Sequence, residues 1–418
     1  MPQQNFNRSQ VEGKTLIVGF DFGTHSSKVV LRERGNESGR VARFDDPTEG
    51  YPDGTSPSVV RQVDDRLYFG SSALRRSGGS LHNSLKVRLL SDGSRATVAS
   101  SDSLDHASLV AAYLAWAFQQ IRESLIGENY ANELLNLAAP MSHFENVLLK
   151  QKYLRILQAA WKLSFESSAS PIRQGIPVSE VARLLKPLMT MPIQGEQKRR
   201  FNVLPETIAP VVSLSLDPWM EPGMYVILDI GAGTTEISVF HAGTPGEGQK
   251  VLCYRDETML LGGNDLHLAE RLEGDRRSEE ISKIVSQLKK QYCRLWQMGY
   301  QVDAPNHNAR KRWQELTLVL SGGGTKHPEV AAGLAEANPI FPWPESEIQL
   351  RHYRHNPGQL GRNVGMRDAD LSMFAVANGL SIERAHWPIL FQQNEIDQLE
   401  PSRDIEDKPD GYWYIDAK

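Results

Sequence analysis

The spacing of apolar and polar residues predicts short strands that are separated by glycine-rich turns and interrupted by amphipathic helices. Residues 15–31 predict a β-hairpin, in which an apolar strand, a hydroxyl-rich turn and a second strand follow one another. The same order of strand, glycine turn and strand returns at residues 224–240. Further buried strands are predicted at 134–140, 202–204 and 316–324, and the last of these ends in glycines.

Helices are predicted where apolar residues recur every three or four positions. Asp105 is a favourable N-cap for the first of them, the apolar segment DHASLVAAYLAWAFQQI. The other predicted helices lie at 143–163, near 178–188, from about Asp265, over 276–298 and at 370–382. Strands and helices are interspersed in both halves of the chain, which indicates an α/β fold.

Length, composition and net charge limit the classes of protein to which the chain can belong. The chain has 418 residues, which favours two lobes or more. Apolar residues make up 40% and charged residues 23%, as in an ordinary soluble protein. The net charge of −5 gives no basic field, so we expect no direct binding to nucleic acid.

The cysteines and the hydropathy bear on location. Cys253 and Cys293 are far apart with no CxxC, which we interpret as reduced core thiols in a cytoplasmic protein. The polar start of the sequence does not resemble a signal peptide. No apolar run reaches the roughly 18 residues of a membrane helix, so we expect no membrane association.

Two short turns carry the candidate chemistry, DFGTHSS at 21–27 and DIGAGTTE at 229–236. Each places an aspartate at a strand end beside a glycine, where the backbone can approach phosphate and successive N–H groups can surround an anion. Two facing carboxylates suit a hydrated Mg2+. Either turn alone fits a tight hairpin equally well. Both together, with a third glycine-rich strand end at 322–324, predict a phosphate-binding cleft between two similar halves.

These turns resemble the phosphate motifs of the actin-like ATPase superfamily, which includes actin, the 70-kDa heat-shock chaperones and the bacterial plasmid-segregation and rod-shape actins. The resemblance runs in order through DFGTHSS, PSVV with FGSSA, NVLPETIAP, DIGAGTTEIS, LGGNDL, LSGGGTKHP and FAVANGL, over about residues 15–382. It implies a two-lobed actin-like ATPase (duplicated ribonuclease-H-like) fold with ATP in the central cleft.

The resemblance also implies a division of the chain. We expect a disordered N-terminus at 1–13, lobe I at 14–220, lobe II at 221–385 with a closing helix at 370–382, and a C-terminal tail at 386–418. Lobe I would carry an insert at 165–200.

The resemblance assigns site residues one by one. Asp21 and Asp229 would hold Mg2+, largely through water, and Glu206 would orient or deprotonate the attacking water. Lys86 resembles the lysine that contacts the γ-phosphate in the heat-shock family, although a surface lysine is an equal alternative. Lys326 would pack on the adenine.

The remaining implied contacts are glycines and small residues. Backbone N–H groups would meet the β-phosphate from Gly23, Thr24 and His25. The γ-phosphate side would be met by Gly231, Gly233 and Thr234. Gly263 would lie near the cleft, and the strand end that approaches the nucleotide would be formed by Gly322, Gly323 and Gly324. Two positions depart from the family pattern: His25 replaces a small or hydroxyl residue, and Ala232 replaces a glycine.

Different motifs favour different branches of the superfamily. SPSVV followed by FGSSA, Lys86 and LGGNDL favour a chaperone-like ATP switch that turns over slowly and signals by lobe closure, here without a substrate-binding domain. VLPETIAP, DIGAGTTEIS and DLSMFAVANGL favour the filament-forming actins, which self-assemble. A pseudo-ATPase scaffold and a sugar or acetate kinase remain lesser alternatives. A protein partner that reads the nucleotide state, ATP or ADP, would bind the 165–200 insert or the 386–418 tail, which carries an aromatic cluster at 412–414.

Overall fold

The structure is a computed structural model. It describes the chain in segments, which are residues 13–91, 104–128, 130–140, 147–166, 174–190, 200–243, 250–305, 309–335, 349–358, 360–361 and 366–391.

The first large sheet, here the N-terminal sheet, is built around the predicted hairpin. Its strands in spatial order are β10 (Phe201–Pro205), β8 (Tyr130–Ala139), β1 (Lys14–Phe22), β2 (Ser26–Glu33), β3 (Gly39–Val41) and β16 (Leu360–Gly361), and β4 (Thr55–Pro57) also pairs with β2. β1 runs antiparallel to β2 and parallel to β8, and β8 runs parallel to β10.

The second large sheet, here the C-terminal sheet, repeats this arrangement. Its order is β15 (Gln349–Arg354), β14 (Glu315–Ser321), β11 (Gly223–Ile230), β12 (Thr235–Ala242), β13 (Lys250–Met259) and β17 (Ile389–Phe391). β11 runs antiparallel to β12 and parallel to β14, which runs parallel to β15. The hairpin predicted at 224–240 is therefore confirmed, and it occupies the same position in its sheet as the hairpin predicted at 15–31.

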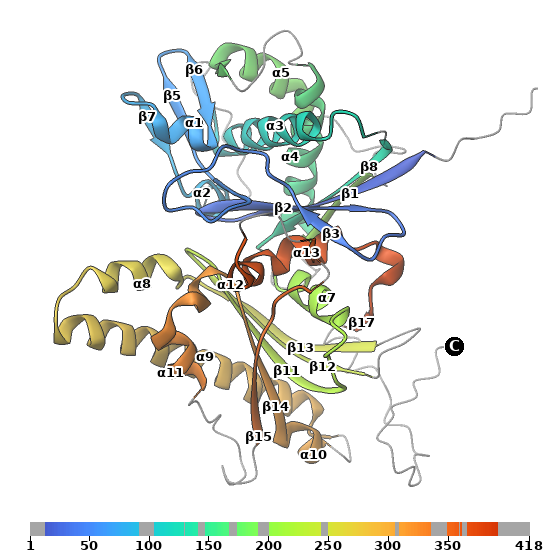
Figure 1. Cartoon of the computed structure of the whole chain (residues 1–418), viewed down its shortest axis with the longest axis vertical. Coiled ribbons are helices and arrows are strands. Elements are labelled where there is room, and N and C mark those ends of the chain that lie inside the picture. Colours follow the sequence, from blue (N-terminus) through green and yellow to red (C-terminus); the bar gives the residue numbers. More distant parts are fainter. Residues whose placement is uncertain are drawn as a thin grey trace, which may run out of the picture.

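Each sheet has its own apolar core, and Figure 1 shows the two sheets one above the other with helices on their outer sides. The N-terminal sheet packs on α3 (His106–Ser124) and α4 (Val147–Glu166), and the C-terminal sheet packs on α9 (Asp275–Asp303). The side chain of Asp105 accepts from the backbone N–H of Ser108, which confirms the predicted N-cap.

Smaller elements extend the two cores. A separate four-stranded sheet is formed by β7 (Ser80–His82), β5 (Val60–Val63), β6 (Arg66–Phe69) and β9 (Ile176–Pro177). Short helices accompany it, namely α1 (Gly70–Arg75) and α2 (Leu85–Ser91). The C-terminal core is completed by α8 (Gly263–Glu270), α10 (Ala309–Gln314) and α11 (Pro328–Ala335). Helix α5 (Val178–Thr190) buries Val181, Leu185 and Leu188, so this part of the 165–200 insert belongs to the N-terminal core.

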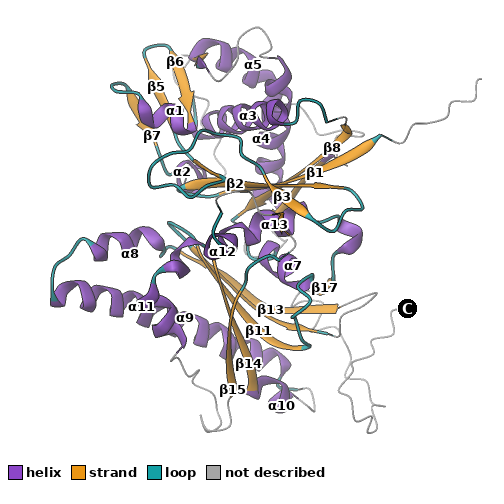
Figure 2. Ribbon diagram, viewed as in Figure 1, coloured by secondary structure: helices purple, strands orange, loops and turns teal. Residues whose placement is uncertain are grey.

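Two helices, α7 (Ala209–Ser215) and α13 (Ala375–Ser381), lie between the sheets in Figure 2. Glycines let α13 approach both of its neighbours. A Cβ on Gly379 would lie 1.9 Å from the carbonyl oxygen of Ala209 on α7, and a Cβ on Gly19 would lie 2.2 Å from that of Ala377. A side chain at either glycine would force the helix away from α7 or from β1.

A chain of buried polar groups crosses this junction. Arg32 on β2 donates to Asn378 Oδ1 (2.8 Å), and Asn378 Nδ2 donates to Ser213 Oγ on α7 (2.9 Å). Ser213 Oγ lies 2.8 Å from His355 Nε2, and His355 Nδ1 lies 3.6 Å from Asp217 Oδ2. The polar chain therefore joins the N-terminal sheet to the segment that follows β15, the edge strand of the C-terminal sheet.

Two expectations differ from the structure. The helix expected at 370–382 is broken into α12 (Asp368–Leu371), a 3-10 turn η4 (Ser372–Phe374) and α13. The segment from His386, expected to be a tail, contributes β17, which pairs with β13. The residues beyond 391, including the aromatic cluster at 412–414, lie outside the described part of the chain, as do residues 1–12.

Two further expectations concern the cysteines and the membrane. Cys253 and Cys293 form no disulfide, and both are partly exposed. Among the segments that the structure describes, no helix combines the length and the apolar character needed to cross a membrane.

Candidate active site

A cavity of about 640 Å³ lies where the carboxyl ends of the central strands of both sheets meet. It gathers residues that the sequence analysis assigned to an active site. These are Asp21, Gly23, Thr24, His25, Lys86, Glu206, Asp229, Gly231, Thr234, Gly263, Gly323, Gly324 and Lys326. Two more predicted residues, Gly233 and Gly322, do not line the cavity but contact residues that do.

Strand topology explains this convergence. Asp21 lies at the end of β1 and Asp229 at the end of β11, while Glu206 directly follows β10. β1 and β10 belong to the same parallel set in the N-terminal sheet, so their carboxyl ends share one edge. The two sheets turn these edges toward a common space, and residues nearly 210 positions apart become neighbours.

The register of each hairpin supplies a second charged residue. In β1–β2 the partner of Asp21 is Lys28, and Lys28 Nζ lies 2.7 Å from Asp21 Oδ2. In β11–β12 the partner of Asp229 is Glu236, which is buried. The equivalent position is therefore a cation in one half and a carboxylate in the other. Neither residue was predicted from the sequence, although each lies seven positions after its aspartate.

The turns at 21–27 and 229–236 lie close enough for their residues to be in contact. A Cβ on Gly233 would lie 3.1 Å from Thr24 Cγ2, so the second turn faces the first directly. A Cβ on Gly23 would meet the carbonyl oxygen of Ser26 at 2.4 Å, which excludes a side chain at this position. Gly322 has φ +84°, and a Cβ there would lie 2.7 Å from Asp229 Oδ1. Gly322 therefore keeps strand β14 against Asp229.

Helix α8 is attached to the second turn through its N-terminus. The backbone N–H of Gly263 donates to Gly231 O (2.8 Å), and that of Asn264 donates to Ala232 O (2.7 Å). Asp265 accepts from the backbone N–H of Gly262 (2.8 Å), which fixes the first turn of the helix. The predicted helix start beside the two glycines is confirmed.

Lys86 and Glu206 form a buried ion pair. The Nζ atom of Lys86 lies 2.5 Å from both carboxylate oxygens of Glu206, and each side chain is at most 5% exposed. Burial alone would lower the pKa of Lys86, but the carboxylates of Glu206, Glu236 and Asp21 together raise it above its usual value. The alternative of a surface lysine is therefore wrong. Burial raises the pKa of Glu206, and the ammonium group of Lys86 opposes this shift while it fixes both carboxylate oxygens in place.

The cavity contains more negative than positive charge. Asp21, Glu206, Asp229 and Glu236 are four buried carboxylates, whereas Lys28 and Lys86 supply two cations beside them. Burial, followed by the proximity of Asp21, raises the pKa of Asp229 to about 6. Burial and Glu206 raise the pKa of Glu236 well above its usual value. One carboxylate oxygen of Glu236, Oε1, has no hydrogen-bond partner in the described part of the chain.

This imbalance fits a divalent cation. The excess of two carboxylates over lysines corresponds to the charge of Mg2+, which prefers oxygen ligands and retains several waters. Within the described segments, no group of three or more His, Cys, Asp or Glu side chains is arranged to bind a metal directly. The residues therefore suit a hydrated ion that is held by two carboxylates and by the groups of a bound substrate.

Lys326, which the resemblance assigns to the adenine, has a charged partner within the protein. Its ammonium group forms an ion pair with Asp370 Oδ1, and Asp370 also accepts from Arg367 Nε (3.2 Å). Burial would raise the pKa of Asp370, but the hydrogen bonds from Lys326 and Arg367 lower it. Lys326 is thus fixed at the cavity wall beside Gly323 and Gly324. Asp370 was not predicted, because 44 residues separate it from Lys326 in the sequence.

His25 and Tyr51 form the wall of the cavity on the side of the N-terminal sheet. Their rings stack face to face, with centroids 4.5 Å apart and planes inclined by 4°. Burial lowers the pKa of His25, and the charges of Lys28 and His267 lower it further. Tyr51 was not predicted, since it lies in a turn-rich segment with no motif.

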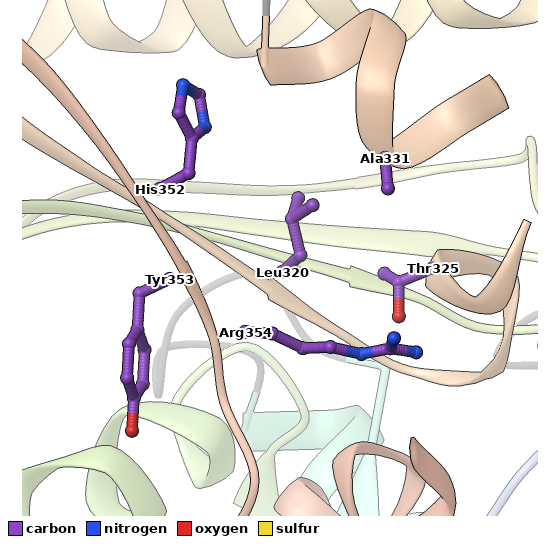
Figure 3. A pocket seen from close by; sticks show the side chains of 6 residues that line it. All are labelled: Leu320, Thr325, Ala331, His352, Tyr353 and Arg354. Carbon is purple, nitrogen blue, oxygen red and sulfur yellow. The ribbon is translucent and has the colours of Figure 1, made fainter. Parts of the chain in front are cut away.

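A smaller cavity of about 280 Å³ lies beside the edge strand β15. In Figure 3, Arg354 extends along it toward Thr325, and His352 projects from the same side of the strand. Tyr353 points away, and its hydroxyl donates to Asp217. This cavity has no carboxylate in its lining and holds none of the predicted catalytic residues.

No protein-family model and no curated protein matches the chain.

Proposed function

We propose that the chain is an actin-like ATPase, which binds ATP with Mg2+ in the cavity between its two sheets and hydrolyses it slowly. The repeated strand order of the two sheets supports a duplicated ribonuclease-H-like fold with two lobes. The single observation that carries the proposal is the pair of equivalent strand ends that bring Asp21 and Asp229 into one cavity beside two glycine turns.

The groups of the cavity have separable tasks in this reaction. Backbone N–H groups of the two turns would bind the phosphate oxygens, because glycine permits a close approach. Lys28 and Lys86 would neutralise phosphate charge from the N-terminal side. Mg2+, when bound between Asp21 and Asp229, would stabilise negative charge on the phosphates. Glu206, held by Lys86, would orient the attacking water.

The output would be closure of the two lobes around the nucleotide. Contacts to the terminal phosphate come from both sheets in this arrangement, so they favour a closed state that hydrolysis weakens. A chaperone-like switch, similar to the 70-kDa heat-shock family, would present that difference to a protein partner.

Self-assembly into filaments is the second candidate, and one observation favours it. Leu260 and Leu268 are 80% and 60% exposed, and Leu272 follows Leu268 one helical turn later. They lie just before, within and just after α8, and an apolar surface of this kind suits another protein or a second copy.

One experiment separates these candidates. The purified protein is sedimented with ATP and Mg2+, with ADP and Mg2+, and without nucleotide, while phosphate release is measured in the same tubes. Slow phosphate release from a protein that stays in the supernatant supports the switch. ATP-dependent pelleting above a critical concentration supports the filament. A protein that neither releases phosphate nor pellets at millimolar ATP would refute both.

The Asp21→Asn variant is the control for the chemistry. It keeps the size of the side chain but removes one of the two charges that would hold Mg2+. Phosphate release should fall to the background rate. Release at the wild-type rate would refute the role of Asp21.

A further inference from the structure

The imidazole of His25 is presented to the cavity by its stacking on Tyr51. The phenol ring covers one face of the imidazole, so the ring is oriented and its edge is left for other contacts. Neither ring nitrogen of His25 forms a hydrogen bond with any residue that the structure describes. The backbone of His25 is fixed as well, because its carbonyl oxygen accepts from the N–H of Ser58 (2.9 Å).

The groups that face His25 come from three elements. Lys28 on β2 lies in the same turn region and pairs with Asp21. Tyr51 belongs to the loop at 50–52, which lines the cavity. Across the cavity α8 contributes His267 and Glu270, and Glu270 is 2.9 Å from His327 Nε2. In the protein alone, burial disfavours the protonated form of His25, and the charges of Lys28 and His267 disfavour it further.

Phosphate would reverse this balance. The backbone turn that carries His25 is the one expected to meet the β-phosphate, and the polyphosphate would add several negative charges near Lys28. A protonated imidazole donates from both nitrogens and forms a charge-assisted hydrogen bond to a phosphate oxygen. The face of Tyr51 also stabilises a cationic ring that lies over it.

We propose that the His25 side chain is a direct contact of the nucleotide's phosphates and binds one proton from solvent when the nucleotide binds. This inference rests on the proposed function of the same cavity. It goes further, because it makes the affinity for nucleotide depend on pH through one identified group. His25 is thus a specificity-determining residue for the charged part of the ligand.

The expected effect follows from linkage between proton and ligand binding. Between the pKa of His25 in the free protein and its higher pKa in the complex, affinity should rise as pH falls, by at most about tenfold per pH unit. Other groups titrate in the same range. Asp229 would release a proton when Mg2+ binds, and the ligand's own phosphate also ionises. The informative quantity is therefore the difference in proton uptake between the wild type and a variant that has a neutral side chain at residue 25.

The experiment is calorimetric titration with Mg2+–ADP and with a non-hydrolysable ATP analogue, between pH 6 and 8. Buffers of different ionisation enthalpy give the number of protons taken up. His25→Asn should reduce proton uptake and weaken binding at pH 6 by about tenfold relative to wild type, with a much smaller difference at pH 8. Tyr51→Phe, which keeps the stacked ring, should retain the wild-type uptake, whereas Tyr51→Leu should reduce it.

His267→Asn is the matched control, because it removes the other titratable imidazole that influences His25. It should retain most of the proton uptake. Wild-type uptake in His25→Asn, or loss of uptake in His267→Asn alone, would overturn the inference while leaving nucleotide binding in place. Failure of the wild-type protein to bind either nucleotide at any pH would overturn the proposed function itself, and the inference with it.

Discussion

The charge imbalance of the cavity leads to a prediction about stability that is independent of catalysis. Asp229 is buried, and burial together with Asp21 raises its pKa from 3.8 to about 6. A carboxyl group whose pKa is higher in the folded state favours folding only while it is protonated. The fold therefore loses stability as the pH rises from about 4 to about 6, because the unfolded chain ionises in this range before the folded chain does. Replacing Asp229 by Asn removes this cost and keeps the shape of the side chain.

The magnitude follows from the two pKa values. Near pH 7 a rise from 3.8 to about 6 corresponds to about 3 kcal/mol of lost folding free energy. The sign follows from the direction of the shift. The contribution of Asp229 is fully favourable below about pH 4, and it is lost as the pH rises through 6. Asp229→Asn should therefore be more stable than wild type by about 3 kcal/mol at pH 7 and by about half of that near pH 5.

The assay is urea unfolding of protein freed of nucleotide and metal, measured at several pH values from 5 to 8. Dilute protein is needed, because the pI of about 6.2 lies in this range. The same variant should release no phosphate from ATP above background. Lower stability of Asp229→Asn at pH 7, or a stability gain that does not change with pH, would refute the electrostatic reasoning.

A second buried carboxylate supplies the contrast. Asp303 is 1% exposed, but its oxygens accept from Arg312 Nη2 (2.6 and 2.8 Å) and from Trp313 Nε1 (2.6 Å). In Asp303→Asn, the largely buried guanidinium group of Arg312 loses the negative charge with which it pairs. The substitution should lower the free energy of unfolding by about 3 kcal/mol at pH 7. If Asp229→Asn and Asp303→Asn changed the free energy of unfolding equally, burial alone, and not charge pairing, would determine how a buried carboxylate affects stability.

The other predictions concern the ion pair and the C-terminal segment. Glu206→Gln should still bind ATP but should release phosphate about a hundredfold more slowly, and unchanged turnover would exclude a water-positioning role. Lys86→Met should lose about 3 kcal/mol in urea unfolding, because a buried carboxylate loses its partner, and the double variant with Glu206→Gln should lose less than the sum of the two. Removal of residues 392–418 should leave phosphate release intact. Trp387→Ala should cost about 2 kcal/mol of stability, since this ring packs between two apolar clusters and donates to Ile382 O.

Local patterns were sufficient to predict the hairpins and the strand ends. The alternation around Asp21 and Asp229 depends only on neighbouring residues, and glycines next to each aspartate mark the turns. These signals also led to the residues that now share the large cavity. Lys28 and Glu236 were missed, although hairpin register could have identified them, because a turn of known length fixes which residue pairs with each aspartate.

Contacts between distant segments could not be predicted in the same way. The ion pair of Lys326 with Asp370 depends on how the strand end after β14 meets α12. The break of the helix at Ser372 and the addition of β17 beside β13 are also tertiary effects. Hydrophobic periodicity is continuous through 370–382, so it gives no sign of the break. In each case packing against another element overrides the local preference.

The buried polar chain from Arg32 through Asn378, Ser213 and His355 to Asp217 has a consequence for cooperativity. If either half unfolded alone, the other would retain buried donors or acceptors that had lost their partners, at about 1–3 kcal/mol for each group. Unfolding of one half alone therefore carries two free-energy costs at the junction: the unpaired polar groups and the lost packing of α7 against α13. The slowest-exchanging amide hydrogens of β1 and β11 should consequently report the same opening free energy, as in a single cooperative unit.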